Sequence, residues 1–205
     1  MADPMQLPME QRAALEAAYS APPRAYHSFA HVKEVLRHYA EVDAGPGWHN
    51  AAEAWLAVLY HDAVYVPGRR DNERCSARLA LEHIRRWLPD ARVQGARVAE
   101  LIELTACHGS IGTEDLGSGP EALDAMHFLD CDMAILGAPP DAFDAYDRGI
   151  EAEYAGVLPA PVFRFNRRRF LKSLLKRDRI FLSDHFHERY DRNARENLAR
   201  ALSLR

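Results

Sequence analysis

Apolar residues recur three and four positions apart along almost the whole chain, and runs of alternating β-branched residues are nearly absent. This is the spacing of amphipathic helices rather than of strands. We therefore predict an all-α fold. The predicted helices cover about residues 10–19, a segment that starts after Ser28 and ends before Gly45, residues 51–64, 72–88, 90–108 and 121–137, a segment that ends near Tyr154, and residues 167–177 and 188–202.

Prolines, glycines and small polar residues set the predicted helix ends. Pro22 and Pro23 stop the first helix, because proline lacks the amide hydrogen and clashes with the preceding turn. Ser28 is a good N-cap, and Gly137 is a natural C-cap. No segment resembles a linker, so we predict one domain over residues 1–205, with residues 160–205 as a packed helical extension.

The composition is that of a soluble globular protein, with 48% hydrophobic and 27% charged residues among 205. The net charge of −4 gives no reason to expect binding to nucleic acid or to an anionic membrane. No apolar run is long enough to span a bilayer, and the first ten residues contain no signal-peptide core, so we expect a cytoplasmic protein. Cys75, Cys107 and Cys131 form no C-x-x-C pair and indicate reduced thiols.

A His-Asp pair, His61-Asp62, lies near the end of the apolar run AAEAWLAVLYHDAVY. Ionised carboxylates are rarely buried unless they are paired or bound to a metal. Successive helix residues point about 100° apart, so a metal ion over the shared edge could be reached by both side chains. Taken alone, such a pair is more often a solvated helix end.

Five blocks of sequence change that balance. They are RAYHSFAH (24–31), LYHDAVY (59–65), DNERCSA (71–77), TACH (105–108) and FLDCDMAILG (128–137). In this order they resemble the HD-domain superfamily, in particular its bacterial branch of uncharacterised predicted phosphohydrolases, over about residues 24–202. The resemblance implies an HD-type helical bundle with additional C-terminal helices, and an enzyme that hydrolyses a phosphate ester or anhydride.

The resemblance also implies a set of metal ligands: His31, His61, Asp62 and one aspartate of the LDCDM segment. Asp130 and Asp132 are two positions apart on a helix and flank its apolar stripe on opposite sides, so periodicity alone does not choose between them. The MAILG stretch after Asp132 looks like the family pattern. We therefore predict Asp132 as the ligand and Asp130 as a residue that supports it.

Two imidazoles and two carboxylates suit one divalent ion and leave coordination positions open. We predict Mn²⁺, and the set also suits Mg²⁺, Fe²⁺, Co²⁺ or Zn²⁺. Such an ion would acidify a water molecule and withdraw charge from a phosphate oxygen. The predicted substrate is a nucleotide or another small phosphorylated metabolite, and the predicted catalytic residues are Asp62 and Glu73.

Glu73 follows the His-Asp loop in the DNE segment, where the resemblance implies a general base or a group that orients water. Its alternative role is that of an acid favoured by the helix dipole at a helix start. Asn72 and Ser76 are predicted to support it. The predicted phosphate-binding residues are Arg24, His27, His108 and Arg168, each of which could instead be a surface or structural residue.

Two further functions stay open at this stage. His83 follows the His-Asp pair and precedes His108, an order that some dinuclear HD proteins, including iron oxygenases, also show. A non-catalytic module that senses a nucleotide or a metal is the other alternative. The basic segment RFNRRRFLKSLLKR contains phenylalanines among its cations, but its apolar stripe favours an amphipathic helix over a nucleic-acid interface. The oligomeric state is open, and a homodimer is one option.

Overall fold

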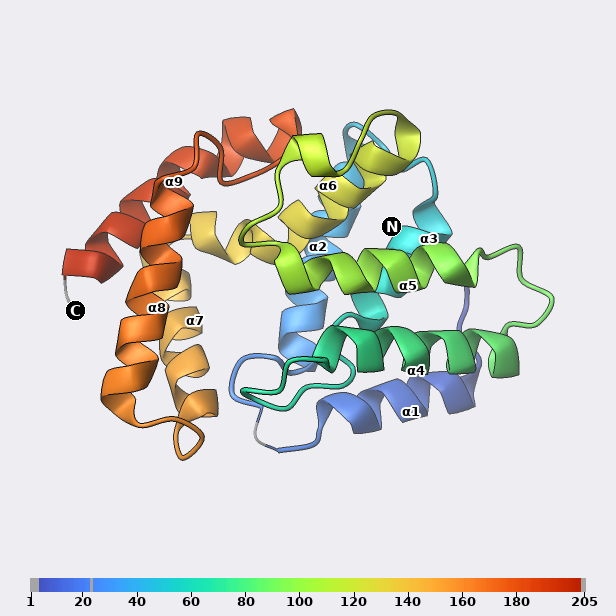
Figure 1. The fold of residues 1–205 in the computed structure, drawn as a ribbon. Helices are drawn as coiled ribbons and strands as arrows, with labels where there is room; N and C mark the ends of the chain where they lie inside the picture. Colours follow the sequence, from blue (N-terminus) through green and yellow to red (C-terminus); the bar gives the residue numbers. More distant parts are fainter. Residues whose placement is uncertain (1–3, 23, 204–205) are drawn as a thin grey trace.

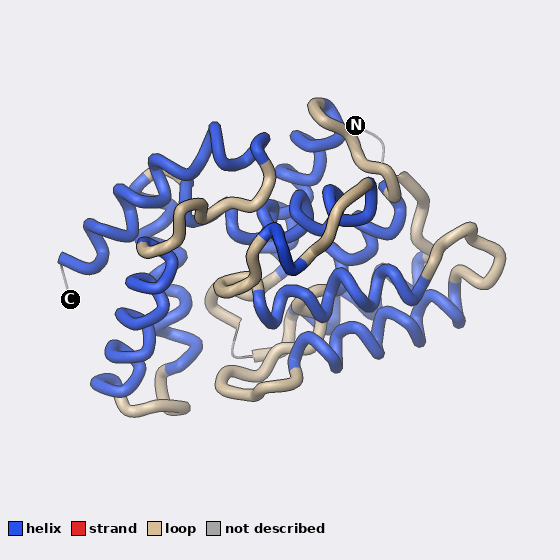
Figure 2. The backbone as a smooth tube through the Cα atoms, turned by 45° about the horizontal axis from the view of Figure 1, so that its top comes forward, coloured by secondary structure: helices blue, strands red, loops and turns tan. Residues whose placement is uncertain are grey.

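The computed structural model describes residues 4–22 and 24–203. This part of the chain contains α-helices and short 3₁₀ segments but no strand, which confirms the all-α prediction (Figure 2). None of its helices is long and apolar enough to cross a membrane. The elements are α1 (Met9–Tyr19), α2 (Phe29–Ala44), α3 (Ala51–Tyr60), α4 (Asn72–Trp87), α5 (Gly95–Leu104), η1 (Thr105–Cys107), η2 (Thr113–Asp115), α6 (Pro120–Met133), η3 (Ala134–Gly137), α7 (Pro140–Tyr154), α8 (Ala160–Leu175) and α9 (Asp184–Ser203).

Helix α3 is the buried centre of the fold. Every residue from Glu53 to Tyr60 is buried, as its almost uniformly apolar sequence predicts. Helices α2, α4, α5 and α6 all pack against it, and α4 and α5 lie side by side (Figure 1). Helix α1 is joined to the same core by Gln11, whose side-chain amide donates to the Tyr60 hydroxyl at 2.9 Å.

The last three helices lie at the other side of the molecule, where α8 packs along α9 (Figure 1). Helix α9 is held against η3 by Asn197, whose side chain donates to the Leu136 and Ala138 carbonyls at 2.9 and 2.8 Å. Gly137 allows this approach, because a Cβ atom there would lie 2.7 Å from the Tyr190 carbonyl oxygen. Its role is therefore close packing as well as the end of a helix.

Helix α3 ends at Tyr60, four residues before the predicted end, so the prediction of a helix to Val64 is wrong. The backbone N–H of His61 still donates to the Ala57 carbonyl, after which the chain turns. The Arg24 guanidinium donates to the carbonyls of Asp62 and Ala63 at 2.9 and 3.0 Å. Those carbonyls are therefore satisfied outside a helix, and the His-Asp pair lies at the helix end.

Other helix boundaries are moved by buried carboxylates. Glu53 accepts a hydrogen bond from the Gln94 backbone at 2.8 Å and holds the loop before α5, which starts at residue 95 instead of the predicted 90. Asp130 accepts from the backbones of Leu182 and Ser183, and α9 starts directly afterwards, four residues earlier than predicted. Helix α8 also starts earlier, at residue 160 instead of 167.

Candidate metal centre and its cavity

Four polar side chains from three parts of the fold meet at one point. His31 lies in the first turn of α2, His61 and Asp62 follow the end of α3, and Asp132 is in the last turn of α6. The Nε2 atoms of His31 and His61 are 3.1 Å apart. Asp62 Oδ2 lies 3.6 and 3.2 Å from these two nitrogens, and Asp132 Oδ1 lies 3.1 and 3.5 Å from them.

These distances fit a single metal ion. Two ligand atoms at about 2.1 Å from one ion are roughly 3.0 Å apart at right angles and about 3.4 Å apart in a tetrahedron. The atoms that His31, His61 and Asp62 offer all lie within 4.8 Å of one another. The two nitrogens and the Asp62 oxygen therefore match a divalent transition-metal site in size and chemistry, and Asp132 Oδ1 lies close to both nitrogens.

His61 is oriented to present a lone pair to this point. Its Nδ1 lies 2.8 Å from the Val58 carbonyl oxygen, which can only accept a hydrogen bond. The proton of a neutral His61 ring is therefore on Nδ1, and Nε2 is free to bind an ion. The last turn of α3 thus fixes the tautomer that a metal ligand needs.

The aspartate that reaches the cluster is Asp132, not Asp130. The Asp130 carboxylate accepts from the backbones of Leu182 and Ser183, both at 2.7 Å, and from the Ser183 hydroxyl at 2.6 Å. It therefore holds the start of α9 and contacts no residue of the cluster among these bonds. Its predicted role as a support for Asp132 stays a prediction, and the bonds seen here are those to Leu182 and Ser183.

Burial and neighbouring charges shift the pKa values of the cluster residues. Burial would raise the pKa of Asp132, but His108, His31 and His61 beside it hold that pKa well below its usual value. Burial would likewise lower the pKa of His61, but Asp62 and Asp132 raise it well above the usual value. Burial lowers the pKa of His31. In the metal-free cluster Asp62 and Asp132 thus favour a proton on His61, whereas burial disfavours one on His31.

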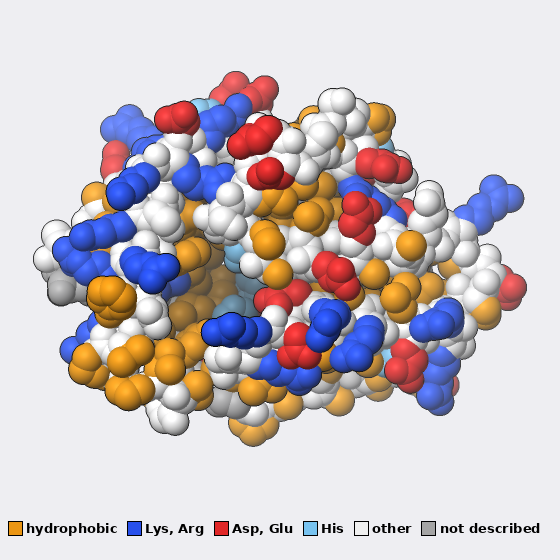
Figure 3. Space-filling view, viewed as in Figure 1, with side chains coloured by type: hydrophobic (Ala, Val, Ile, Leu, Met, Phe, Trp, Pro, Cys, Tyr) orange, Lys and Arg blue, Asp and Glu red, His pale blue; other side chains and the backbone are white. Residues whose placement is uncertain are grey.

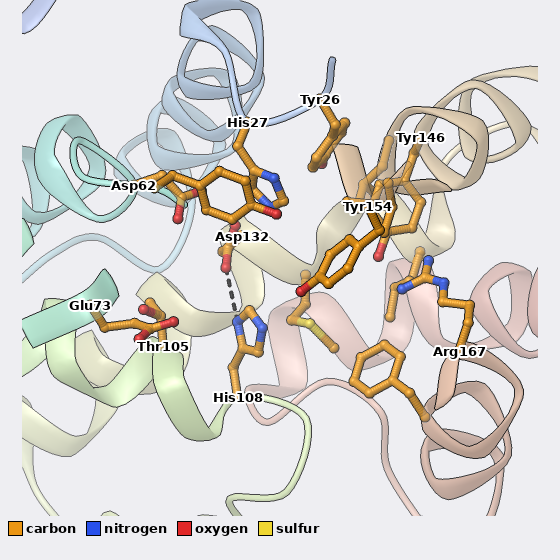
Figure 4. A pocket seen from close by; sticks show the side chains of 16 residues that line it. Tyr26, His27, Asp62, Glu73, Thr105, His108, Asp132, Tyr146, Tyr154 and Arg167 are labelled. Carbon is orange, nitrogen blue, oxygen red and sulfur yellow. Dashed lines mark ion pairs between the residues drawn. The ribbon is translucent and has the colours of Figure 1, made fainter. Parts of the chain in front are cut away.

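The cluster opens into a cavity of about 220 Å³. In the space-filling view the face is hollowed beside the C-terminal helices, with histidine inside the hollow and arginine or lysine near its rim (Figure 3). Asp62 and Asp132 line the cavity, and so do the predicted site residues Glu73, His27 and His108 (Figure 4). The remaining wall includes five aromatic residues: Tyr26, Tyr65, Tyr146, Tyr154 and Phe170.

Glu73 lies in the first turn of α4 and lines the cavity. Asn72 and Ser76, which we expected to support Glu73, instead hold the loop after the His-Asp pair. Asn72 exchanges two hydrogen bonds with the backbone of Val66, and the Val64 backbone donates to the Ser76 hydroxyl at 3.0 Å.

The two histidines predicted to handle phosphate both line the cavity. The His27 ring stacks on Tyr65 with centroids 4.0 Å apart, and its Nδ1 lies 2.6 Å from Glu153 Oε2. His108 Nδ1 lies 2.9 Å from Asp132 Oδ2, the ion pair marked in Figure 4. Burial opposes a charge on His108, but Asp132 raises its pKa. His108 is thus biased towards a cationic form at the cluster.

The two arginines predicted to bind phosphate lie elsewhere. The Arg24 guanidinium donates to the carbonyls of His27, Asp62 and Ala63, so its role is to hold the backbone behind the cluster. Arg168 donates to the Leu202 carbonyl at 2.8 Å, at the end of α9. Neither lines the cavity. The arginine that lines the cavity is Arg167, the neighbour of Arg168.

His83, the candidate for a second metal, lies on α4 away from the cluster. Its Nδ1 is 3.0 Å from the Tyr60 hydroxyl, and its ring meets Trp87 edge to face at 4.5 Å. The group of potential ligands found among the described residues contains His31, His61 and Asp62 but not His83. The cysteines are free thiols, of which Cys75 and Cys131 are buried and Cys107 is exposed.

Two charged residues of the site were missed in the sequence. Glu153 is buried on α7 and accepts hydrogen bonds from the backbones of Tyr26 and His27 at 2.7 and 2.8 Å. Arg167 is buried on α8. Both lie three or four residues from apolar residues of the same helix face, such as Ile150 for Glu153. A charged residue within an apolar stripe was therefore the sequence signal that could have identified them as buried site residues.

Comparisons with models of protein families, with curated proteins and with solved structures found no match to this chain.

Proposed function

We propose that this protein is a metal-dependent phosphohydrolase of the HD type, which cleaves a phosphate ester or anhydride of a nucleotide or another small phosphorylated metabolite. The observation that carries the proposal is the convergence of His31, His61, Asp62 and Asp132 at one end of a cavity. One divalent ion held by these four residues, with Mn²⁺ as our first choice, would acidify water and draw charge from the phosphate.

The other residues of the cavity can serve the same reaction. Glu73 lines the cavity and is not one of the four proposed metal ligands. This suits a group that orients a water molecule and accepts a proton from it. His108, biased towards its cationic form by Asp132, can donate a hydrogen bond to a phosphate oxygen or a proton to the leaving group. His27, held by Glu153, is placed to contact the same oxygens.

The cavity favours this proposal over a binding module without turnover. A sensor needs only ligands and a pocket, whereas a cavity that also holds an acid and a histidine beside the donor atoms has the groups that proton transfer requires. A dinuclear iron centre gains no support from His83, which contacts Tyr60 and Trp87.

The test is a screen of purified protein loaded in turn with Mn²⁺, Co²⁺, Mg²⁺ and Fe²⁺ against nucleotides and phosphate esters. Phosphate release that depends on the metal is the expected result. No release from any substrate with any ion, in protein shown to hold metal, would refute the proposal.

Glu73→Gln gives a sharper test of the mechanism. The amide keeps the shape but cannot accept a proton, and a general base typically contributes about 10²- to 10⁴-fold. We expect kcat on the best substrate to fall by that factor while the metal content is unchanged. Glu82→Gln, an exposed position on the same helix, is the matched control and should leave kcat unchanged. An unchanged kcat in Glu73→Gln would make Glu73 a helix-start residue, and loss of metal would make it a ligand.

A further inference from the structure

Arg167 is a buried cation in the wall of the cavity. It is 8% exposed, and its side chain projects from α8 into the space that the cluster also lines (Figure 4). Among the described residues that line this cavity, it is the only arginine, and none is a lysine. Buried arginines are uncommon unless their charge and their five N–H groups are used.

The surroundings of Arg167 use only part of its hydrogen-bonding capacity. Its Nε lies 3.0 Å from Asp147 Oδ1. Its guanidinium lies over the rings of Tyr146 and Phe170, with Cζ 4.9 and 5.4 Å from their centroids. Its Nη2 is buried and has no hydrogen-bond partner. A buried charged donor without an acceptor is costly, which favours an acceptor supplied by a ligand.

Arg167 stays charged in this environment. Burial works against the charge, but Tyr146 and Asp147 beside it raise the pKa of the guanidinium. The rings of Tyr146 and Phe170 hold the guanidinium group in one orientation, so little side-chain entropy is lost when an anion binds. A planar fork held in this way suits the oxygens of a phosphate or a carboxylate.

Arg167 lies across the cavity from the metal ligands. Figure 4 shows it well apart from Asp62 and Glu73. Two tyrosines stand between it and the cluster: the Tyr26 ring lies 4.7 Å from the His31 ring and 4.7 Å from the Tyr146 ring, on which the guanidinium stacks. An anion at Arg167 is therefore a different group from a phosphate at the cluster.

We infer that Arg167 binds a second anionic group of the substrate, a phosphate or a carboxylate, while the phosphate to be cleaved lies at the His-Asp cluster. Only the statement that a phosphate is cleaved at the cluster rests on the proposed function. The rings of Tyr146, Tyr154 and Phe170 line the cavity around the arginine and can cover the body of such a molecule. The substrate class is a small phosphorylated metabolite with anions at both ends.

The first test needs neither metal nor turnover. Inorganic phosphate is titrated calorimetrically into protein treated with EDTA, so that no metal ion at the cluster can bind it. We expect Arg167→Gln to weaken phosphate binding by about tenfold or more, the usual effect of losing a charge-assisted hydrogen bond. Arg168→Gln is the matched control, since Arg168 faces the Leu202 carbonyl, and should bind phosphate as the wild type does. Acetate in place of phosphate then separates a preference for phosphate from one for carboxylate.

Arg167→Lys keeps the charge and covers the case in which the glutamine variant does not fold. It loses Nη2 and the fork, and we expect weakened phosphate binding in a protein whose circular dichroism is unchanged. Wild-type protein that does not bind phosphate, or a folded Arg167 variant whose Kd stays within twofold of the wild type, would overturn the inference.

A second test uses turnover with a nucleoside bisphosphate and the corresponding monophosphate. We expect Arg167→Gln to raise KM about tenfold or more for the bisphosphate and much less for the monophosphate, with kcat largely kept. Phosphate binding that depends on Arg167 in a protein without hydrolase activity would refute the proposed function alone. Hydrolysis with phosphate binding and KM unchanged in Arg167→Gln would refute the second anion site alone.

Discussion

The two aspartates of the LDCDM segment should separate cleanly when each is replaced by alanine. Asp130 is 2% exposed and accepts from three donors at the start of α9, two of them the backbone N–H groups of Leu182 and Ser183. Asp132 faces His31, His61 and His108. Asp130→Ala should therefore cost stability, and Asp132→Ala should cost metal affinity.

The size of the stability loss follows from the groups left without a partner. A buried donor without an acceptor costs about 1–3 kcal/mol, and the two backbone donors at Leu182 and Ser183 cannot rotate as the hydroxyl can. Burial raises the pKa of Asp130 to about 7, so removing the carboxylate also removes part of its own burial cost. We expect Asp130→Ala to lower the free energy of unfolding by about 2–4 kcal/mol, and hence Tm by roughly 4–16 °C in a protein of this size. Asp130→Asn, which keeps one acceptor oxygen, should lose about half as much.

The assay pairs thermal unfolding in EDTA with metal content measured by elemental analysis. Asp130→Ala should hold metal with less than a tenfold change in affinity, because its carboxylate does not touch the cluster. Asp132→Ala should lose the metal, which is the result that separates it from Asp130→Ala. An Asp130→Ala protein with wild-type Tm and no metal would reverse the assignment, as would an Asp132→Ala protein with stoichiometric metal.

Three more outcomes are expected. His61→Ala and Asp62→Ala should each lose the metal and the activity together, whereas His83→Ala should keep the metal; stoichiometric metal in Asp62→Ala would exclude it as a ligand. Because the pKa of His61 is raised, its proton competes with the metal, so metal affinity should fall about tenfold per pH unit below that pKa and level off above it. Calorimetry in buffers of different ionisation enthalpy should detect proton release on metal binding, and a metal affinity that does not change with pH would contradict this. Arg24→Gln should lower Tm and weaken metal binding about tenfold with KM unchanged, because Arg24 holds the carbonyls of Asp62 and Ala63. A raised KM with Tm and metal binding unchanged would instead indicate that Arg24 binds the substrate.

The sequence predicted the helices better than their ends. Helical periodicity is a property of each segment, so the all-α class and the buried centre at α3 could be predicted from it. The ends depend on hydrogen bonds from distant residues. Arg24 satisfies carbonyls beyond Tyr60, and Glu53 holds Gln94, so neither boundary is encoded near the position where it falls.

The candidate ligands illustrate the same division. The motif blocks pointed to His31, His61 and Asp62, and the structure brings these three side chains within ligand distance of one another. Periodicity left Asp130 and Asp132 open, because residues on either flank of a stripe are equivalent until the neighbours of each flank are known. Those neighbours are α9 on one side and the cluster on the other, two contacts that no local pattern contains.

The arginine that lines the cavity, Arg167, is the neighbour of Arg168, the arginine predicted from the sequence. In a run of three arginines on a helix, successive side chains point about 100° apart, so an apolar face can take one and leave the others to solvent or to the helix edge. The buried residues of α8 are Phe163, Arg167, Leu171 and Leu174, and steps of four keep the first three on one face. The predicted stripe of Phe170, Leu171, Leu174 and Leu175 has Arg167 three and four positions before its first two residues, so Arg167 lies on the same side of the helix. The four-residue spacing thus identifies Arg167 as the arginine that turns inward, and its Nη2 is buried without a hydrogen-bond partner.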